Sequence, residues 1–134
     1  MRDTDIVLAG RLADAAGAAI RPFFRAAFEH EAKADSSPVT EADRAAEAAI
    51  RAILDVERPD DAIIGEEYGE KTGTSGRTWV LDPIDGTVSF MAGRPIFGTL
   101  IALLDHGWPV LGVIDQCISG ERWIGAAGKP TTLG

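Results

Sequence analysis

Two stretches in the first half of the chain carry apolar residues at the spacing of an amphipathic helix. Between positions 3 and about 30, apolar residues recur every three or four positions, which predicts a helix that Pro22 kinks or divides. A second helix is predicted to begin near Thr40, because Thr40 and Asp43 fit a helix-capping pattern and Ala, Ile and Leu recur after them. Each helix would bury one face against another layer.

The rest of the chain alternates short apolar runs with turns rich in Gly and Pro, a pattern typical of strands. The pattern predicts a brief strand at 62–64, a loop at 65–76, and a strand at 78–81 that Pro83 ends. Further strands are predicted at 97–104, 109–114 and 121–124. Two helices followed by strands with hairpin connections predict an α+β fold, in which helices pack as a layer on a largely antiparallel sheet.

Composition and charge exclude several classes of protein. The 134 residues are 46% hydrophobic and 25% charged, as in one ordinary globular domain. The formal charge of -8 has the wrong sign for a nucleic-acid binder. No apolar run is long enough for a membrane helix, and the N-terminus lacks the layout of a signal peptide. We therefore expect a cytoplasmic protein whose partners include neither nucleic acid nor a membrane.

The segment DPIDGT, which begins at Asp82, holds the most informative chemistry. Asp82 and Asp85 flank a rigid turn, and with the Ile84 carbonyl they can offer several oxygen ligands to Mg²⁺ in one small volume. Gly86 permits tight curvature, and Thr87 can cap a following helical turn whose free N–H groups favour a phosphate. The same residue types are common in ordinary turns, so this segment alone leaves a purely structural role open.

A second acidic pair, Glu66 and Glu67, follows the other short buried run. If the two strands are neighbours, both sets of acids converge at one edge of the sheet, and crowded carboxylates repel one another unless a cation is present. Bound Mg²⁺ would also make the acidic site attractive to a phosphate ester. Paired Mg²⁺ ions can activate a water and stabilise the leaving oxygen, which predicts phosphate hydrolysis without a covalent intermediate.

Together, GEE at 65–67, DPIDGT at 82–87 and VTEAD at 39–43 resemble the signature of the inositol monophosphatase superfamily of Mg²⁺-dependent, lithium-sensitive phosphatases. Segments further along the chain, at 93–104 and 109–125, look most like the histidinol-phosphatase branch. The resemblance implies a phosphomonoesterase that hydrolyses L-histidinol phosphate, a small metabolite of histidine biosynthesis, by means of a metal-activated water. The nearest alternative is an inositol-1-monophosphatase.

The resemblance also implies roles for individual residues. It gives four metal ligands: Glu66, Asp82, Asp85 and the carbonyl oxygen of Ile84. Thr87, oriented by Asp43, would position the attacking water. Glu67 would support the metal shell, and Gly86 with Thr87 would face the phosphate.

Several features depart from the family pattern. Ser89 stands where many members have Asn, and Val88 where histidinol-phosphatase-like members often have Arg. Members also take one metal-binding Asp from a Trp-Asp motif in their second half, whereas no Asp follows Asp115 here. We therefore expect residues 1–134 to be an N-terminal metal-binding half without its C-terminal half, incompletely active and with one side of the sheet uncovered. The complete protein is expected to be a homodimer. The alternative from another class is a truncated, non-catalytic metal-binding or dimerisation module.

Overall fold

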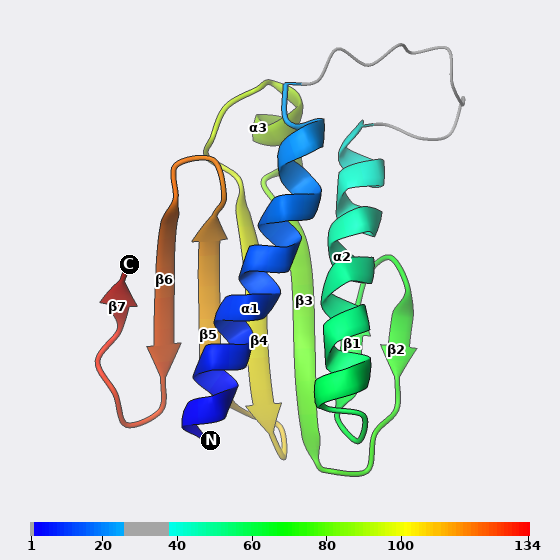
Figure 1. Ribbon diagram of the computed structural model, residues 1–134, viewed down its shortest axis with the longest axis vertical. Coiled ribbons are helices and arrows are strands. Elements are labelled where there is room, and N and C mark those ends of the chain that lie inside the picture. Colours follow the sequence, from blue (N-terminus) through cyan, green and yellow to red (C-terminus); the bar gives the residue numbers. More distant parts are fainter. Residues whose placement is uncertain (1, 26–37) are drawn as a thin grey trace.

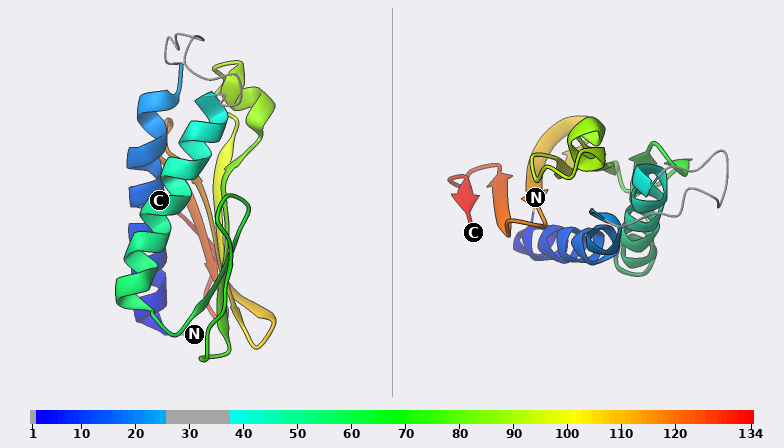
Figure 2. Two further views of the ribbon diagram at one scale, coloured as in Figure 1. Left: turned by 90° about the vertical axis from the view of Figure 1, so that its right-hand side faces the viewer. Right: turned by 90° about the horizontal axis from the view of Figure 1, so that it is seen from above.

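The computed structural model describes residues 2–25 and 38–134, which form a layer of helices on a seven-stranded sheet (Figure 1). Helices α1 (Asp3–Ile20) and α2 (Pro38–Glu57) lie side by side over one face of the sheet. Figure 2 shows both helices on the same side, while no second layer of helices covers the opposite face in this part of the chain. The predicted α+β architecture is therefore confirmed.

The strands follow one another across the sheet almost in chain order. They are β1 (Ala62–Gly65), β2 (Gly69–Lys71), β3 (Arg77–Asp85), β4 (Gly98–Asp105), β5 (Trp108–Gln116), β6 (Glu121–Ala126) and β7 (Thr132–Leu133). Their spatial order is β2-β1-β3-β4-β5-β6-β7. Within the described residues, β1 and β3 are the one parallel pair of neighbours, and the other pairs are antiparallel, as the sequence predicts for most of the sheet.

The core lies between the two helices and the inner face of the sheet. Ala46, Ile50 and Leu54 recur at four-residue spacing on α2 and are fully buried. Trp79 and Leu81, on β3, are buried at alternate positions, as expected where successive side chains of a strand point to opposite faces. Burial of each large apolar side chain contributes about 1.5–3 kcal/mol. No helix in the described part of the chain combines the length and hydropathy that a membrane span requires.

The structure confirms a break at Pro22 and a second helix that begins near Thr40, and it gives their bounds. Helix α1 ends at Ile20, and residues 21–23 form a short 3₁₀ turn, because Pro22 lacks the N–H that a continuing α-helix needs. Positions 26–30 of the predicted helix lie outside the described residues. Helix α2 begins at Pro38, so Thr40 lies inside its first turn. The expected capping pair of Thr40 and Asp43 is therefore wrong.

Three expectations for the strands are also wrong. Strand β3 runs through Pro83 to Asp85, because the register between β3 and β4 shifts between Asp82 and Asp85, and proline is tolerated at such a bulge. The expected loop at 65–76 contains β2, which forms a hairpin with β1. The short strand β7 pairs with β6 near the C-terminus, beyond the strand expected at 121–124 and where no further strand was predicted.

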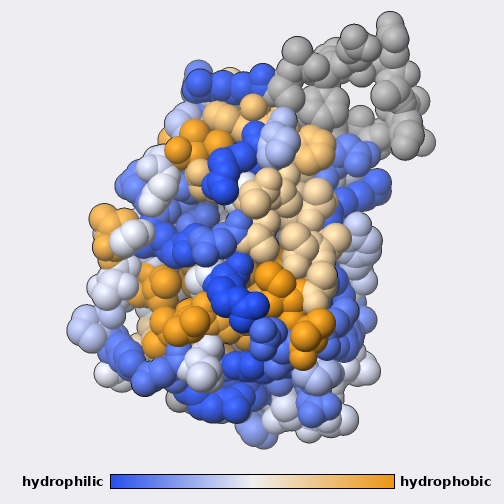
Figure 3. Space-filling model, in the orientation of Figure 1, coloured by the Kyte–Doolittle hydropathy of each residue, from blue (hydrophilic) through white to orange (hydrophobic). Residues whose placement is uncertain are grey.

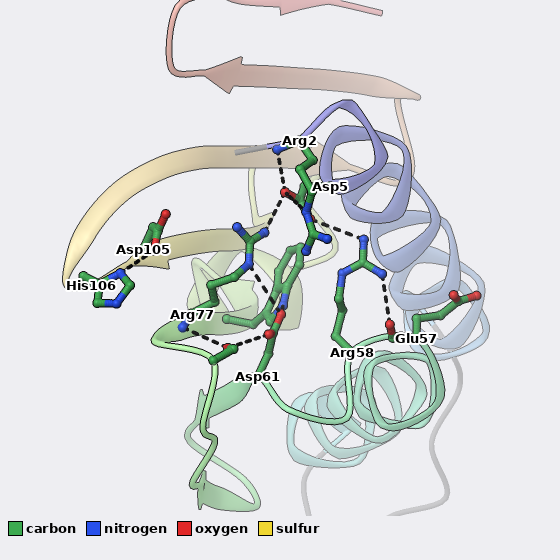
Figure 4. Close-up of polar contacts among 10 residues, drawn as sticks. Arg2, Asp5, Glu57, Arg58, Asp61, Arg77, Asp105 and His106 are labelled. Carbon is green, nitrogen blue, oxygen red and sulfur yellow. Dashed lines mark hydrogen bonds and ion pairs between the residues drawn. The ribbon is translucent and has the colours of Figure 1, made fainter.

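Buried ion pairs join α1 to the beginning of β3 and to Arg58, the residue that follows α2 (Figure 4). The fully buried Asp5 of α1 lies 2.6 Å from Nη2 of Arg77 and 3.3 Å from Nη2 of Arg58. Arg77 also faces Asp61, whose Oδ2 accepts a 2.9 Å hydrogen bond from Nε1 of Trp79. This network holds the helix layer to the sheet at the beginning of β3, whereas the DPIDGT segment lies at the other end of that strand.

The two sides of the molecule expose different surfaces. Figure 3 looks onto the helix side, where hydrophilic side chains surround apolar ones. The opposite side has an apolar trough of about 560 Å³, lined by Val80, Asp82, Ile114 and Trp123 among others. Ile114 is 53% and Trp123 46% exposed, so this side of the sheet presents large apolar side chains to its surroundings.

Candidate functional site

The parallel pairing of β1 and β3 brings the two acidic motifs together. Gly65 lies opposite Leu81 in the register, so the residues that follow, Glu66 and Asp82, occupy neighbouring positions. Burial, followed by the charges of Glu66 and Asp85, raises the pKa of Asp82 above its ordinary value. Glu66 and Asp85 therefore lie close enough to Asp82 to affect its ionisation.

Asp43 joins this group from the helix layer. Burial, followed by the charges of Glu67 and Asp82, raises the pKa of Asp43 to about 7. The Ile84 amide donates a hydrogen bond to the Asp43 carboxylate, and this bond lowers the pKa of Asp43 and so opposes part of the rise. This bond connects α2 directly to the DPIDGT segment.

Among the residues that the structure describes, most of these acidic side chains have no ion-pair partner. Oε2 of Glu67 forms an ion pair with Nε of Arg44 at 3.4 Å. Within residues 2–25 and 38–134, none of Glu66, Asp82 and Asp85 has an ion-pair partner. The described part of the site therefore carries an excess of negative charge.

A sharp turn at Gly86 leads from β3 into the short helix α3 (Thr87–Met91). The φ angle of Gly86 is +93°, which glycine adopts with little strain, and a Cβ there would lie 3.2 Å from Cα of Phe97. Gly86 occupies the N-cap position and no side chain caps the helix, so the expected capping role of Thr87 is wrong. Thr87 is exposed and makes no hydrogen bond with Asp43, although α2 and α3 are in contact.

Thr99 supports the bulge that separates the two aspartates of the motif. It is fully buried on β4, and its hydroxyl donates a 2.7 Å hydrogen bond to the carbonyl of Pro83. This bond fixes the backbone between Asp82 and Asp85. Sequence reasoning missed Thr99, since a threonine within an apolar strand gives no local sign of a partner on the neighbouring strand.

Glu47 is a second residue that sequence reasoning missed. Its carboxylate is fully buried and accepts hydrogen bonds from the amides of Glu67 and Tyr68. The available signal was its position four residues after Asp43, which places both acids on the same side of α2.

The site offers oxygen donors of the kind that bind Mg²⁺ or Ca²⁺: carboxylates and the Ile84 carbonyl. In the part of the chain that the structure describes, no three His, Cys, Asp or Glu side chains are grouped closely enough to enclose a metal ion. Repulsion between carboxylates favours such spreading. Burial, and after it repulsion between carboxylates, raises the pKa values of Asp43 and Asp82. A divalent cation would relieve the repulsion, so the donor set fits such an ion.

Known proteins are similar to this chain over most of its length. The chain matches the inositol monophosphatase family over residues 1–134. It is 54% identical over 124 residues to the bifunctional phosphatase IMPL2, chloroplastic, of Arabidopsis thaliana, a match that covers 91% of this chain and 36% of the relative. It is 43% identical over 130 residues to the histidinol-phosphatase of Mycobacterium tuberculosis, covering 96% of this chain and 50% of the relative.

A solved structure of an inositol monophosphatase from Zymomonas mobilis has the same fold. It matches with a TM-score of 0.87 and 56% sequence identity, covering 98% of this chain and 51% of that one. The chain thus spans about half the length of this structure and of the Mycobacterium relative, and a smaller share of the Arabidopsis protein. The family match along residues 1–134 and the agreement in fold lead to one conclusion: the chain belongs to the inositol monophosphatase family.

Proposed function

We propose that this chain is the metal-binding part of a Mg²⁺-dependent phosphomonoesterase that hydrolyses L-histidinol phosphate to L-histidinol and phosphate. The observation that carries the proposal is the convergence of Glu66, Asp82 and Asp85 at the paired ends of β1 and β3, without an ion-pair partner among the described residues. Unneutralised carboxylates would repel a phosphate ester, whereas a divalent cation reverses the local charge.

Four groups would hold the metal: the carboxylates of Glu66, Asp82 and Asp85 and the carbonyl of Ile84. When bound, Mg²⁺ supplies Lewis-acid polarisation of the phosphate oxygens and lowers the pKa of a water. The bulge that Thr99 supports would keep these ligands at fixed spacing.

Other residues of the chain would orient the substrate and the attacking water. Thr87 would hold the water by its hydroxyl, and Asp43, which is anchored by the Ile84 amide, would fix the position of Thr87. Glu67, paired with Arg44, would support the metal ligands. The backbone at Gly86 and Thr87 would face the phosphate, because the first N–H groups of a helix have no partner within it.

The choice of histidinol phosphate is supported by the names of relatives. Proteins from three organisms that are 43–47% identical to this chain are named histidinol-phosphatase. An inositol monophosphate is the second candidate, because the Zymomonas inositol monophosphatase shares the fold at higher identity. The test compares kcat/KM for the two compounds in the presence of Mg²⁺, using this chain extended by its downstream sequence. A preference for the inositol phosphate would favour the second candidate.

We further propose that residues 1–134 are the N-terminal half of a cytoplasmic, homodimeric enzyme and have incomplete activity alone. The short span of this chain relative to its relatives supports the first part of this proposal. The test is Mg²⁺-dependent phosphate release by residues 1–134 and by the extended chain. Equal turnover would contradict the proposal. Mg²⁺ binding without phosphate release by either protein would favour a non-catalytic metal-binding or dimerisation module.

A further inference from the structure

Beneath the loop that carries the second acidic motif lies a carboxylate with no solvent exposure. The Glu47 side chain on α2 is 0% exposed. Its Oε1 accepts a 3.2 Å hydrogen bond from the amide of Glu67, and its Oε2 accepts one of 2.9 Å from the amide of Tyr68. Burial of a charged group is unfavourable unless such bonds compensate it, so this contact is a specific one.

Arg51, one helical turn further along α2, extends the same contact. Its Nε donates a 3.1 Å hydrogen bond to Oε2 of Glu47, and its Nη2 donates to the carbonyl of Gly69. Its guanidinium carbon lies 6.0 Å from the centre of the Tyr68 ring. Two side chains of α2 therefore hold the backbone at three successive residues, 67 to 69.

The space at Gly65 shows how closely the Glu47 carboxylate fits beneath the loop. A Cβ on Gly65 would lie 2.5 Å from both Cδ and Oε1 of Glu47 and 2.7 Å from its Oε2. These distances are far below van der Waals contact, and the three nearest atoms all belong to Glu47. Gly65, the last residue of β1, therefore leaves room for the Glu47 carboxylate only because it has no side chain.

We propose that Glu47 is a positioning residue, whose carboxylate fixes the path of the backbone after β1 and thereby the distance between the carboxylates of Glu66 and Asp82. The inference rests on the proposed function, in which both are metal ligands. Repulsion between Glu66 and Asp82 pushes the loop away from β3, and the bonds from Glu47 and Arg51 oppose that movement. Glu47 acts through the backbone, since its oxygens already accept N–H groups.

The test begins with Glu47→Gln, which keeps the side-chain size but replaces one acceptor oxygen by an NH₂ group facing an amide N–H. We expect the Kd for Mg²⁺ of the 134-residue chain, measured by calorimetry below the Tm of the variant, to rise about 10- to 100-fold. Without Mg²⁺, hydrogen exchange at the amides of Glu67 and Tyr68 should accelerate. Glu57→Gln is the matched control, because Glu57 lies on α2 and pairs with Arg11 in an exposed contact. It should leave both measurements unchanged.

A second pair of variants tests the fit directly and does not depend on the folding of Glu47→Gln. Gly65→Ala should weaken Mg²⁺ binding, because its Cβ displaces the Glu47 carboxylate. In a Glu47→Ala background the same substitution meets no carboxylate, so the double variant should bind Mg²⁺ no more weakly than Glu47→Ala alone. If the fold-increases in the Kd for Mg²⁺ caused by Gly65→Ala and Glu47→Ala multiply in the double variant, the two substitutions act independently. That result would contradict the positioning role of Glu47.

The outcomes separate this inference from the function on which it rests. A wild-type chain that binds Mg²⁺, together with a Glu47→Gln variant of equal affinity, would overturn the positioning role and leave the proposed metal site intact. A lower Tm with unchanged affinity would show that Glu47 is only structural and would overturn it as well. A wild-type chain that does not bind Mg²⁺ would contradict the proposed metal site itself.

Discussion

Gly65 lies opposite Leu81 in the parallel ladder between β1 and β3, so the residues that follow, Glu66 and Asp82, lie side by side where β1 ends. In an antiparallel pair, the ends of the two strands would point in opposite directions. The single parallel pair of the described sheet is therefore what brings Glu66 close to Asp82. Burial and the charges of Glu66 and Asp85 then raise the pKa of Asp82, as expected where anions are crowded.

The buried network around Asp5 predicts a pH-dependent contribution to stability. Burial alone would raise the pKa of Asp5, but a hydrogen bond from the Arg2 amide and contacts with Arg77 and Arg58 lower it below its ordinary value. The carboxylate therefore stabilises the fold above the unfolded-state pKa of about 3.9, and this contribution is lost as the pH falls through the lower folded-state value. Asp5→Asn should reduce the free energy of unfolding at pH 7 by about 3–5 kcal/mol.

Urea unfolding of wild type and Asp5→Asn at pH 7 and pH 3 measures this effect, and the difference between them should shrink at pH 3. Asp3→Asn is the matched control on the same helix, because Asp3 pairs with Lys129 in an exposed contact and should contribute little. A difference between wild type and Asp5→Asn that is as large at pH 3 as at pH 7 would contradict the electrostatic explanation.

The hydroxyl of Thr99 is predicted to stabilise the bulge in β3. Thr99→Val keeps the shape of the side chain but leaves the carbonyl of Pro83 without its donor in a buried position. The expected loss is about 1–3 kcal/mol in the free energy of unfolding, measured by urea denaturation. Thr78→Val, at a half-buried position of the same sheet, should change stability by no more than about 0.5 kcal/mol. Equal effects of the two substitutions would show that the Thr99 bond is unimportant.

Local patterns of apolar residues in the sequence predict most of the helices and strands of the fold. Ala46, Ile50 and Leu54 predict the buried face of α2, and they are fully buried. Strand β2 was missed because its three residues carry no apolar alternation, and it is held by backbone pairing with β1. The boundary at Pro83 was wrong because the sequence of one strand does not reveal a register shift against its neighbour.

In the candidate site, too, the sequence predicts the local motifs but not the contacts between distant segments. Glu66 and Asp82 each follow an apolar run, so their convergence was predictable on the condition that the two strands are neighbours. The pairing itself is a tertiary property. Glu47 gave no comparable signal, because its partners are backbone amides twenty residues further along the chain.

The open face of the sheet is predicted to make the 134-residue chain self-associate. Ile114 and Trp123 pair across β5 and β6 and are both about half exposed beside the apolar trough. Exposed apolar patches of this kind favour association. Sedimentation velocity should show concentration-dependent association that Ile114→Lys weakens. Val56→Lys, which replaces an exposed apolar residue on the helix side, should have no effect. A wild-type chain that stays monomeric at every concentration would contradict this prediction.

The central claim, a divalent cation site built from β1 and β3, is tested most directly by calorimetric titration of Mg²⁺ into wild type and Asp82→Asn. We predict binding at millimolar Mg²⁺ by the wild-type chain and none by Asp82→Asn, because the substitution removes an anionic ligand at the centre of the acidic group. Asp55→Asn, which changes an exposed carboxylate of α2 paired with Lys71, should bind as the wild type does. Unchanged Mg²⁺ affinity in Asp82→Asn would contradict the claim.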